Sequence, residues 1–308
     1  MTEPIGILAP AYVLGEEELS VDSIANRHSV LSRYNMPDRA ELWGWGSYRR
    51  TQRSRAQLAG ASASATIAQG GLRSADIDGL MVCCGDGLNY YGQNQVISEL
   101  ASALGVRGGF VSWIGGAGCA SLFSAVQVAR ALAAGGLYRN LLVIAVDKIE
   151  DETERFQRFG VFSDGACSFV VRKGSGIDYA ILGAEAAFSV AALTAAGQDL
   201  AQKCQLIYDV FERLAAQSGA ALDGSALLGS NVFLPIQELE LSVMPVKKPV
   251  PYRANTVRYG HCAGADPVIN LIDFYRDAEH GAVDRALLTS TAHGHFGAIL
   301  LEPRTRVM

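Results

Sequence analysis

The sequence predicts an α/β fold built from two similar halves. Short apolar runs that suit buried strands alternate with longer segments in which apolar residues recur every three or four positions. This alternation is typical of a parallel or mixed sheet covered by helices on both faces. Residues 119–173 contain a loop, a helix, a strand, a glycine turn and a strand, and residues 261–303 contain the same series. We therefore expect a pseudo-twofold axis between residues 1–174 and residues 175–308.

The individual elements follow from apolar spacing and from glycine or proline at their ends. Two helices in the first half stop at glycine, and the last helix of the chain opens with a proline in its first turn. The predicted strands are residues 79–84, 140–148, 166–174, 178–188, 285–292 and 296–303. The predicted helices are residues 93–105, 121–136, 199–219 and 267–281.

Composition excludes several classes of protein. The chain has 308 residues, of which 49% are hydrophobic and 19% charged, with a formal net charge of −5. An acidic balance disfavours sequence-independent binding of nucleic acid, which needs basic phosphate contacts. No run approaches the roughly 18 apolar residues of a membrane span. The N-terminal segment "MTEPIGILAP" has no basic residues, so we expect no secretory signal. The cysteine spacing is unlike that of a zinc site. We expect a cytoplasmic protein with reduced thiols and no metal, nucleic-acid or membrane partner.

Cys119 is the candidate nucleophile. It lies in "GGAGCAS" (115–121), between a glycine-rich loop and the start of a predicted helix. Unpaired N–H groups and the positive end of the helix dipole favour a thiolate at such a position. The glycines before it permit sharp backbone geometry and close approach of a substrate. The alternative is a small core residue, because free cysteine is commonly buried.

His261 is the candidate base for this cysteine. It lies in "RYGHCAGADP", a loop that enters the helix equivalent to the one after Cys119, so the pseudo-twofold axis would bring the two residues together. Asp266 follows five residues later and either orients the imidazole through its ring N–H or caps the helix. The alternative for His261 is a loop histidine with a purely structural role.

At these residues the chain resembles the ketoacyl-carrier-protein synthase III family of the thiolase superfamily. The likeness covers most of the chain in the right order and is carried by "GGAGCASLFSAVQVARALAAG", "FGVFSDGACSFVV", "NTVRYGHCAGADPVINL" and "LLTSTAHGHFGAILLEP". The resemblance implies a five-layered αβαβα thiolase fold with two pseudo-twofold-related halves, usually a homodimer. It also implies that acyl groups arrive as thioesters of coenzyme A or of an acyl carrier protein, with no other cofactor, and move to Cys119.

The chain departs from the condensing members of this family at two places. Those members use a Cys-His-Asn set, in which His and Asn stabilise an enolate. Their histidine motif should fall near residues 227–237, where this chain has Ser230 and Asn231, and their asparagine is replaced by His261. The remaining Cys119, His261 and Asp266 suit plain acyl transfer. The resemblance is therefore to the acyltransferases of antibiotic biosynthesis, which pass acyl groups to hydroxyl, amine or carrier-protein thiol acceptors.

Two other functions stay open, and both can be distinguished from acyl transfer. One is a decarboxylating condensing enzyme that uses a Cys-His dyad, which would release carbon dioxide from a malonyl thioester. The other is a non-catalytic subunit with a thiolase fold, which the presence of Cys119 disfavours. A thiolase is less favoured still, because it would need a second cysteine where His293, Gly294 and His295 stand.

The remaining site predictions concern the oxyanion and the donor. We expect the oxyanion hole to consist of backbone N–H groups of Cys119, His293 and Gly294. A basic run and a neighbouring tryptophan are weaker candidates for contacts with a coenzyme A phosphate or an acidic carrier protein. They are Arg49, Arg50, Arg53 and Trp45. The alternatives are a solvated surface for the arginines and a core position for the tryptophan.

Overall fold

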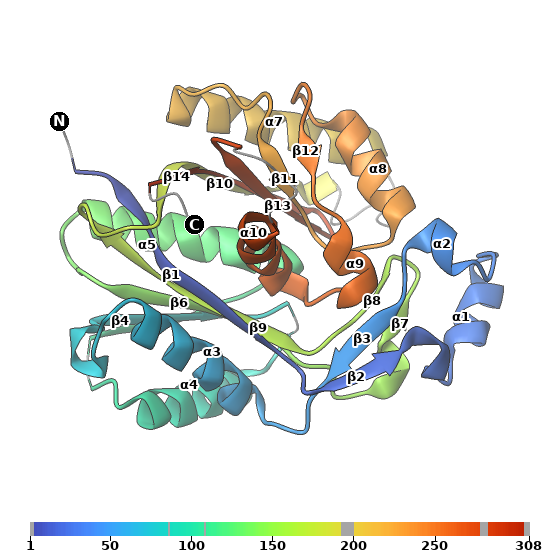
Figure 1. The fold of residues 1–308 in the computed structure, drawn as a ribbon, viewed down its shortest axis with the longest axis horizontal. Coiled ribbons are helices and arrows are strands. Elements are labelled where there is room, and N and C mark those ends of the chain that lie inside the picture. Colours follow the sequence, from blue (N-terminus) through green and yellow to red (C-terminus); the bar gives the residue numbers. More distant parts are fainter. Residues whose placement is uncertain (1–2, 86, 108, 192–199, 278–282, 305–308) are drawn as a thin grey trace.

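Ten strands form one hydrogen-bonded sheet, in the order β12-β11-β13-β14-β10-β1-β9-β6-β4-β5, in the part of the chain that the computed structural model describes. That part is residues 3–304 except 86, 108, 192–199 and 278–282. The sheet folds over on itself, so that its two ends lie in separate layers (Figure 1). The two layers meet where β1 and β10 pair over two positions, Gly6 with Ala180 and Ile7 with Tyr179.

Each layer contains strands from one half of the chain. The first layer consists of β1 (Ile5–Leu14), β4 (Gly79–Cys83), β5 (Phe110–Ile114), β6 (Leu141–Asp147) and β9 (Gly165–Lys173). The second layer consists of β10 (Tyr179–Phe188), β11 (Ala226–Leu228), β12 (Val250–Pro251), β13 (Ala286–Ala292) and β14 (His295–Pro303). In each layer a parallel pair is followed by an antiparallel one: β4–β6 by β6–β9, and β11–β13 by β13–β14.

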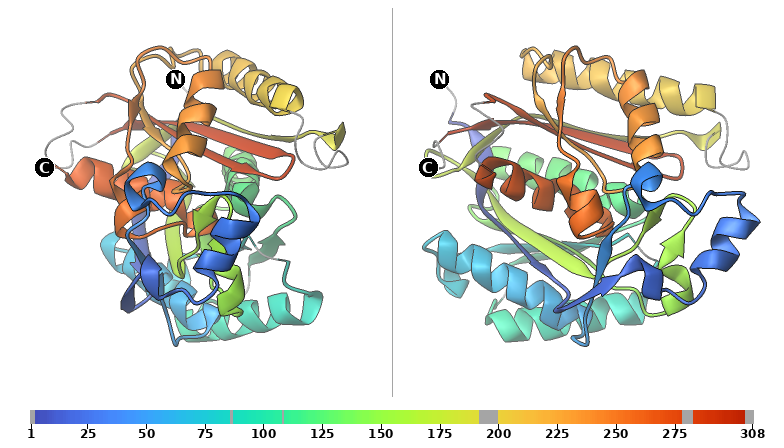
Figure 2. Two further views of the ribbon diagram at one scale, coloured as in Figure 1. Left: turned by 90° about the vertical axis from the view of Figure 1, so that its right-hand side faces the viewer. Right: turned by 45° about the vertical axis from the view of Figure 1, so that its right-hand side comes forward.

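Helices cover both outer faces and fill the space between the layers. The central helices are α5 (Ser121–Ala134) and α10 (Asp266–Arg276). The outer helices are α3 (Arg55–Gln69) and α4 (Tyr90–Leu104) on one side, and α7 (Leu200–Ser218) and α8 (Leu234–Val243) on the other. Figures 1 and 2 show the resulting five layers, which confirm the αβαβα fold predicted from the sequence.

The central helices bury apolar residues from both halves in one core. Leu122 and Phe123 of α5 share a cluster of buried side chains with Ile269 and Leu271 of α10. The packing of α5 on β14 is so close that a Cβ on Gly297 would lie 2.4 Å from the Phe123 ring. The two helices are thereby held with their N-termini near each other, as contacts between the turns that precede them also show.

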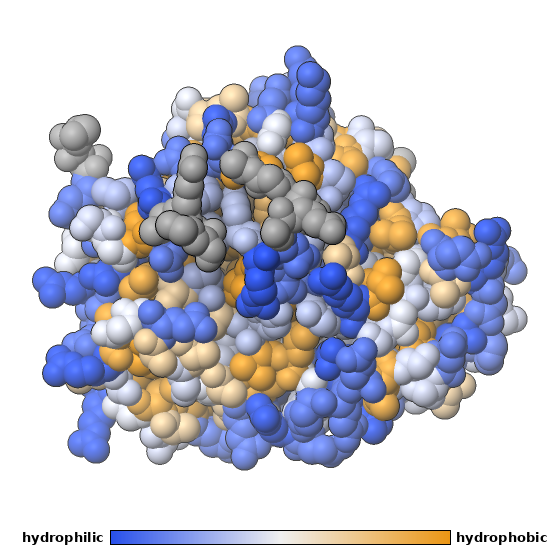
Figure 3. Space-filling view, in the orientation of Figure 1, coloured by the Kyte–Doolittle hydropathy of each residue, from blue (hydrophilic) through white to orange (hydrophobic). Residues whose placement is uncertain are grey.

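The remaining elements lie mostly beside the two layers. They are β2 (Glu17–Ser20), β3 (Ser47–Arg50), β7 (Phe156–Gln157), β8 (Gly160–Val161), α1 (Arg27–Arg33), α2 (Ala40–Trp43) and α9 (Ala254–Arg258). Short 3-10 turns are η1 (Val21–Ser23), η2 (Ser74–Asp76), η3 (Gly118–Ala120), η4 (Glu152–Glu154) and η5 (Ala263–Ala265). Among the described helices, none has the length and apolar character that crossing a membrane requires. Hydrophilic side chains project all around the rim of the face shown in Figure 3.

Every strand and helix predicted from apolar spacing is present, with ends shifted by a few residues. The helix expected from residue 93 begins three residues earlier at Tyr90, because Asn89 accepts a hydrogen bond from the N–H of Gly92 and so caps it. The helix expected over 267–281 ends at Arg276, and residues 278–281 lie outside the described part. Several other elements were not predicted. They are strands β1, β5, β11 and β12, the short strand pairs β2–β3 and β7–β8, and helices α1, α2, α3, α8 and α9.

Candidate active site

Cys119 is the middle residue of the 3-10 turn η3, and this turn directly precedes α5. The loop before it needs glycine, because Gly116 and Gly118 have φ angles of 88° and 53°. A Cβ on Gly118 would also lie 3.0 Å from the Cβ of Ala292. The backbone carbonyl of Cys119 accepts a hydrogen bond from the Ser290 hydroxyl at 3.1 Å. The glycine loop and this hydrogen bond fix a partly exposed thiol at the mouth of the helix.

His261 faces this thiol from the other half of the molecule. Its Nε2 lies 3.3 Å from the Sγ of Cys119, and its side chain is buried. The backbone of His261 is held on both sides, since its N–H donates to the Val161 carbonyl and its own carbonyl accepts from the Ser163 N–H. The Phe162 ring lies 5.0 Å from the imidazole. The structure thus brings together the two residues that sequence symmetry paired.

Asp266 binds the other ring nitrogen of His261. Its Oδ2 lies 2.5 Å from Nδ1, so the hydrogen bond places a proton on Nδ1 and leaves Nε2 facing Cys119. Asp266 is fully buried and is the first residue of α10. It does not cap the helix: the cap position is Ala265, where no side-chain hydrogen bond is made. Of the two roles considered for Asp266, the structure shows the orientation of the imidazole.

Two residues near the expected histidine motif support the site in ways that the sequence did not predict. Asn231 donates its backbone N–H to Asp266 Oδ2 at 2.7 Å and its side-chain amide to Oδ1 at 3.2 Å. The carboxylate also accepts from the Cys262 N–H at 2.7 Å. Ser230 forms a hydroxyl–hydroxyl contact of 3.0 Å with Ser290, the residue that holds the Cys119 carbonyl. The segment therefore positions both Asp266 and the loop of Cys119.

Burial and neighbouring charges have opposite effects on the pKa of His261. Its complete burial favours the neutral ring, but the negative charge of Asp266, the negative charge of Cys119 in its thiolate form and the hydrogen bonds to both favour the cation. The pKa of His261 is therefore raised well above its ordinary value of 6.5. This environment therefore stabilises the protonated imidazolium form of His261.

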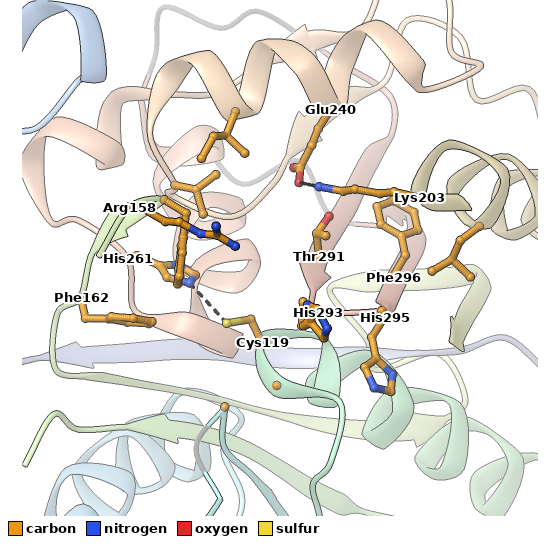
Figure 4. A pocket seen from close by; sticks show the side chains of 18 residues that line it. Cys119, Arg158, Phe162, Lys203, Glu240, His261, Thr291, His293, His295 and Phe296 are labelled. Atoms are coloured by element: carbon orange, nitrogen blue, oxygen red, sulfur yellow. Dashed lines mark hydrogen bonds and ion pairs between the residues drawn. The ribbon is translucent and has the colours of Figure 1, made fainter. Parts of the chain in front are cut away.

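Cys119 and His261 open onto a cavity of about 560 Å³. Its apolar wall consists of Phe159, Phe162, Leu206, Val232, Ile236 and Phe296. Its polar wall contains Arg158, Lys203, Glu240, Thr291 and the turn from Ala292 to His295 (Figure 4). The size suits a small organic group with a few fixed polar contacts. In the described residues no group of three or more potential ligands is placed to hold a metal ion.

The turn between β13 and β14 contains the expected oxyanion-hole residues His293 and Gly294. Both line the cavity together with Cys119, and Gly294 has a φ angle of 68° that favours glycine. The carbonyl of Gly294 accepts from the Ser189 N–H, which fixes the turn against the end of β10. Burial, with a smaller contribution from the charge of His293, lowers the pKa of His295. The oxyanion-hole candidates thus share one cavity wall beside the thiol.

The structure does not bring the weaker donor-binding candidates to this cavity. The β2–β3 register sets Glu18 opposite Arg49 and Glu17 opposite Arg50, and both pairs form ion pairs. Arg53 lies 3.9 Å from Glu16. The basic run is therefore matched by an acidic run that the sequence analysis did not pair with it.

Trp45 is also away from the cavity, because it is part of an aromatic core. Its side chain is buried, with ring centroids 5.4 Å from Phe156 and 5.5 Å from Phe233. Two described cations do line the cavity, Lys203 and Arg158. Arg158 is exposed, and its guanidinium lies 6.0 Å from the Tyr34 ring centroid. No sequence motif marked Arg158, since only the fold places β7 and β8 beside His261.

This combination of fold and site is similar to that of proteins of the synthase III type. The family model of 3-oxoacyl-[acyl-carrier-protein] synthase III matches residues 116–187, which contain Cys119, α5, β6 and β9. Comparison with curated proteins gives no significant match.

Solved structures extend this similarity over the whole chain. ChlB3, described as an acyltransferase, superposes with a TM-score of 0.82 at 19% identity, covering 98% of both chains. The synthase III FabH from Pseudomonas aeruginosa superposes with a TM-score of 0.77 at 19% identity, covering 99% of this chain and 100% of FabH. A variant of OleA from Xanthomonas campestris gives 0.77 at 14% identity, covering 98% of both. At these identities the similarity establishes the fold.

Proposed function

We propose that the protein is an acyltransferase that moves an acyl group from a thioester, through an acyl-cysteine on Cys119, to an acceptor. The observation that carries this proposal is the chain of contacts from Cys119 through His261 to Asp266, opening on a cavity. A nucleophile, a base and a group that orients the base are the three parts of covalent acyl transfer.

The first half-reaction forms the acyl-enzyme. The Cys119 thiolate attacks the thioester carbonyl, and the resulting oxyanion is held by backbone N–H groups of Cys119 and of the His293–Gly294 turn. Each donor of this kind typically contributes about 2.7–4 kcal/mol to lowering the barrier. The intermediate collapses, the carbon–sulfur bond to the donor breaks, and His261 gives its Nε2 proton to the leaving thiolate.

The second half-reaction transfers the acyl group. Acylation removes the negative charge and the hydrogen bond of Cys119, two of the influences that raise the pKa of His261. The pKa of the ring then falls, and neutral Nε2 accepts the proton of the acceptor hydroxyl, amine or thiol as it attacks the acyl carbonyl. Asp266 keeps Nδ1 protonated throughout, so the same ring serves as acid in one half and as base in the other.

Acyl transfer is favoured over decarboxylating condensation because Ser230 and Asn231 are already engaged in hydrogen bonds within the protein. Condensation needs two neutral hydrogen-bond donors at the enolate oxygen, and these residues stand where the histidine motif is expected. Asn231 is engaged by Asp266 and Asn270, and Ser230 by Ser290. Condensation with a Cys119–His261 dyad is the second candidate, and release of carbon dioxide from a malonyl thioester would favour it.

The proposal extends to partners and setting. The donor is an acyl-CoA or an acyl carrier protein, and Arg158 at the cavity replaces the earlier arginine candidates as the contact for its phosphate or acidic surface. The acceptor is a small molecule or a second carrier protein. The thioester is the substrate and no separate cofactor is required. We further propose a cytoplasmic homodimer that serves natural-product biosynthesis of the polyketide or antibiotic kind.

Intact-protein mass spectrometry tests this function. The protein is incubated with a panel of acyl-CoA thioesters, and the mass of one acyl group is expected on the wild type and not on Cys119→Ala. The matched control is Cys204→Ala, because Cys204 is partly exposed and does not line the cavity. Acylation that persists in Cys119→Ala, or none with any thioester or acyl carrier protein, would contradict the proposal.

A further inference from the structure

The Lys203–Glu240 ion pair lines the catalytic cavity but has no role in the mechanism above. Lys203 Nζ lies 3.0 Å from Glu240 Oε1, so the pair connects α7 to α8. The side chains are 33% and 13% exposed, which leaves both accessible in part. Figure 4 shows the pair on the side of the cavity opposite Cys119. A group bound at Cys119 and extending across the cavity would meet these two charges.

The chemistry of the pair defines what it can bind. An ammonium group has three N–H donors and a carboxylate has about four acceptor positions. In the described residues their mutual contact uses one of each, so both donors and acceptors remain for a ligand. The neighbouring wall is apolar, with Leu206 on the same helix as Lys203 and Ile236 on the same helix as Glu240. A ligand that covers the pair must therefore supply its missing hydrogen bonds itself.

We propose that Lys203 and Glu240 form a subsite that selects substrates bearing an uncharged hydroxyl group, on the acyl chain or on the acceptor. A hydroxyl accepts from Lys203 and donates to Glu240 at the same time. A carboxylate would be repelled by Glu240 and an ammonium by Lys203, and an alkyl group would remove water from the pair without replacing it. This inference rests on the proposed acyltransferase function and names the class of substrate that it uses.

Binding to Cys119→Ala tests the subsite without any catalytic step. Calorimetry compares 3-hydroxybutyryl-CoA with butyryl-CoA, and ligand-observed NMR compares 1,2-propanediol with 1-propanol. We expect a preference of about 3- to 10-fold for the hydroxylated member of one pair, the range of a single net hydrogen bond. A preference in the thioester pair places the hydroxyl on the acyl chain, and one in the alcohol pair places it on the acceptor.

The double variant Lys203→Met/Glu240→Leu is expected to remove this preference. The matched control is Arg213→Met/Glu185→Leu, which removes another α7 ion pair, of 3.3 Å, whose residues do not line the cavity. The control should keep the preference. If neither pair of ligands shows a preference, or if the preference persists in the double variant, the proposal is overturned.

A gain of binding provides a second test that misfolding cannot imitate. Glu240→Gln keeps the side-chain volume but leaves the Lys203 ammonium without its anion. We expect this variant, in the Cys119→Ala background, to bind succinyl-CoA about 10-fold more tightly relative to butyryl-CoA than its parent does. An unchanged ratio would overturn the subsite as a contact for the acyl chain. Because these measurements need no acyl transfer, a failure of the acyltransferase proposal would appear separately, in the mass spectra of the wild type.

Discussion

The N-terminal ends of the two central helices, here called the α5 and α10 mouths, have the same local backbone structure. They differ in the surroundings of their reactive residues. A 3-10 turn precedes α5 and another precedes α10, and the two turns are in contact. Cys119 is partly exposed and rests on glycines, whereas His261 is almost completely buried and rests on a carboxylate. The N-terminus of α5 therefore exposes the Cys119 sulfur to substrate. The N-terminus of α10 fixes the His261 imidazole, which exchanges a proton with it.

In the described residues, the N-terminus of α10 continues into a larger buried polar network than the Ser230–Ser290 contact at the N-terminus of α5. Asn231 connects Asp266 to Asn270, and Asn270 accepts from Asn255, whose amide also donates to Asp273. A connected network of this kind fixes side-chain orientation, although the Oδ1 of Asn255 has no hydrogen-bond partner in it. The difference between the mouths teaches that duplication of a unit supplies the positions, while the surrounding hydrogen bonds determine the chemistry at each.

The largest effect is expected from Asp266→Asn. An amide that donates to Nδ1 reverses the imidazole tautomer, so the proton is held on the wrong side of the ring. We expect kcat for acyl transfer to fall by about 10⁴-fold, while the protein stays folded as judged by its thermal unfolding. Steady-state kinetics with the thioester identified by mass spectrometry measure this. A loss of less than 10-fold, with the protein folded, would mean that the α10 mouth does not control the proton.

A smaller effect is expected from Asn231→Ala. The change removes the side-chain bond to Asp266 but keeps the backbone N–H bond, so the carboxylate is held less firmly. We expect about 1–3 kcal/mol of lost stability, because the Asn270 amide loses a buried acceptor. Activity should fall by about 10- to 100-fold, by analogy with other residues that orient a ligating or catalytic group. Chemical denaturation and kcat measure the two, and Asn231→Asp should not restore activity, because it places a second negative charge beside Asp266.

The buried cation of His261 predicts the direction of a pH effect on stability. The pKa of His261 is raised in the folded state, so its contribution is fully present below about pH 6.5 and is lost as pH rises through the raised value. The difference in free energy of unfolding between the wild type and His261→Gln is therefore expected to be larger at pH 6 than at pH 9. Urea denaturation at both pH values measures it. A difference that grows with pH would contradict an imidazolium at this site.

The smallest effect is expected from Arg50→Ala, outside both mouths. Arg50 pairs with Glu17 across the two-stranded β2–β3 sheet, where both side chains are partly exposed, and does not line the cavity. Surface ion pairs of this kind contribute little to stability. We expect kcat and KM for the thioester to stay within error of the wild type. A raised KM would mean that Arg50 contributes to donor binding after all.

Local sequence determined the two halves of the fold and the three residues at their junction. Buried strands such as β6 and helices such as α5 follow from apolar spacing and glycine stops, which depend on near neighbours in the chain. The repeated unit then predicted that Cys119 and His261 meet, since a pseudo-twofold axis relates the two helix N-termini. The sequence repeat thus predicted a contact between two residues that are 142 positions apart.

Only the tertiary structure decided which other side chains surround that contact. Asn231 meets Asp266, Arg158 reaches the cavity and Glu17 neutralises Arg50 because separate elements are packed or paired in a particular register. Such contacts leave no periodic trace in the sequence, since each depends on where two distant segments cross. The Lys203–Glu240 pair could not be predicted for the same reason, because α7 and α8 become neighbours only where they pack over the second layer of strands.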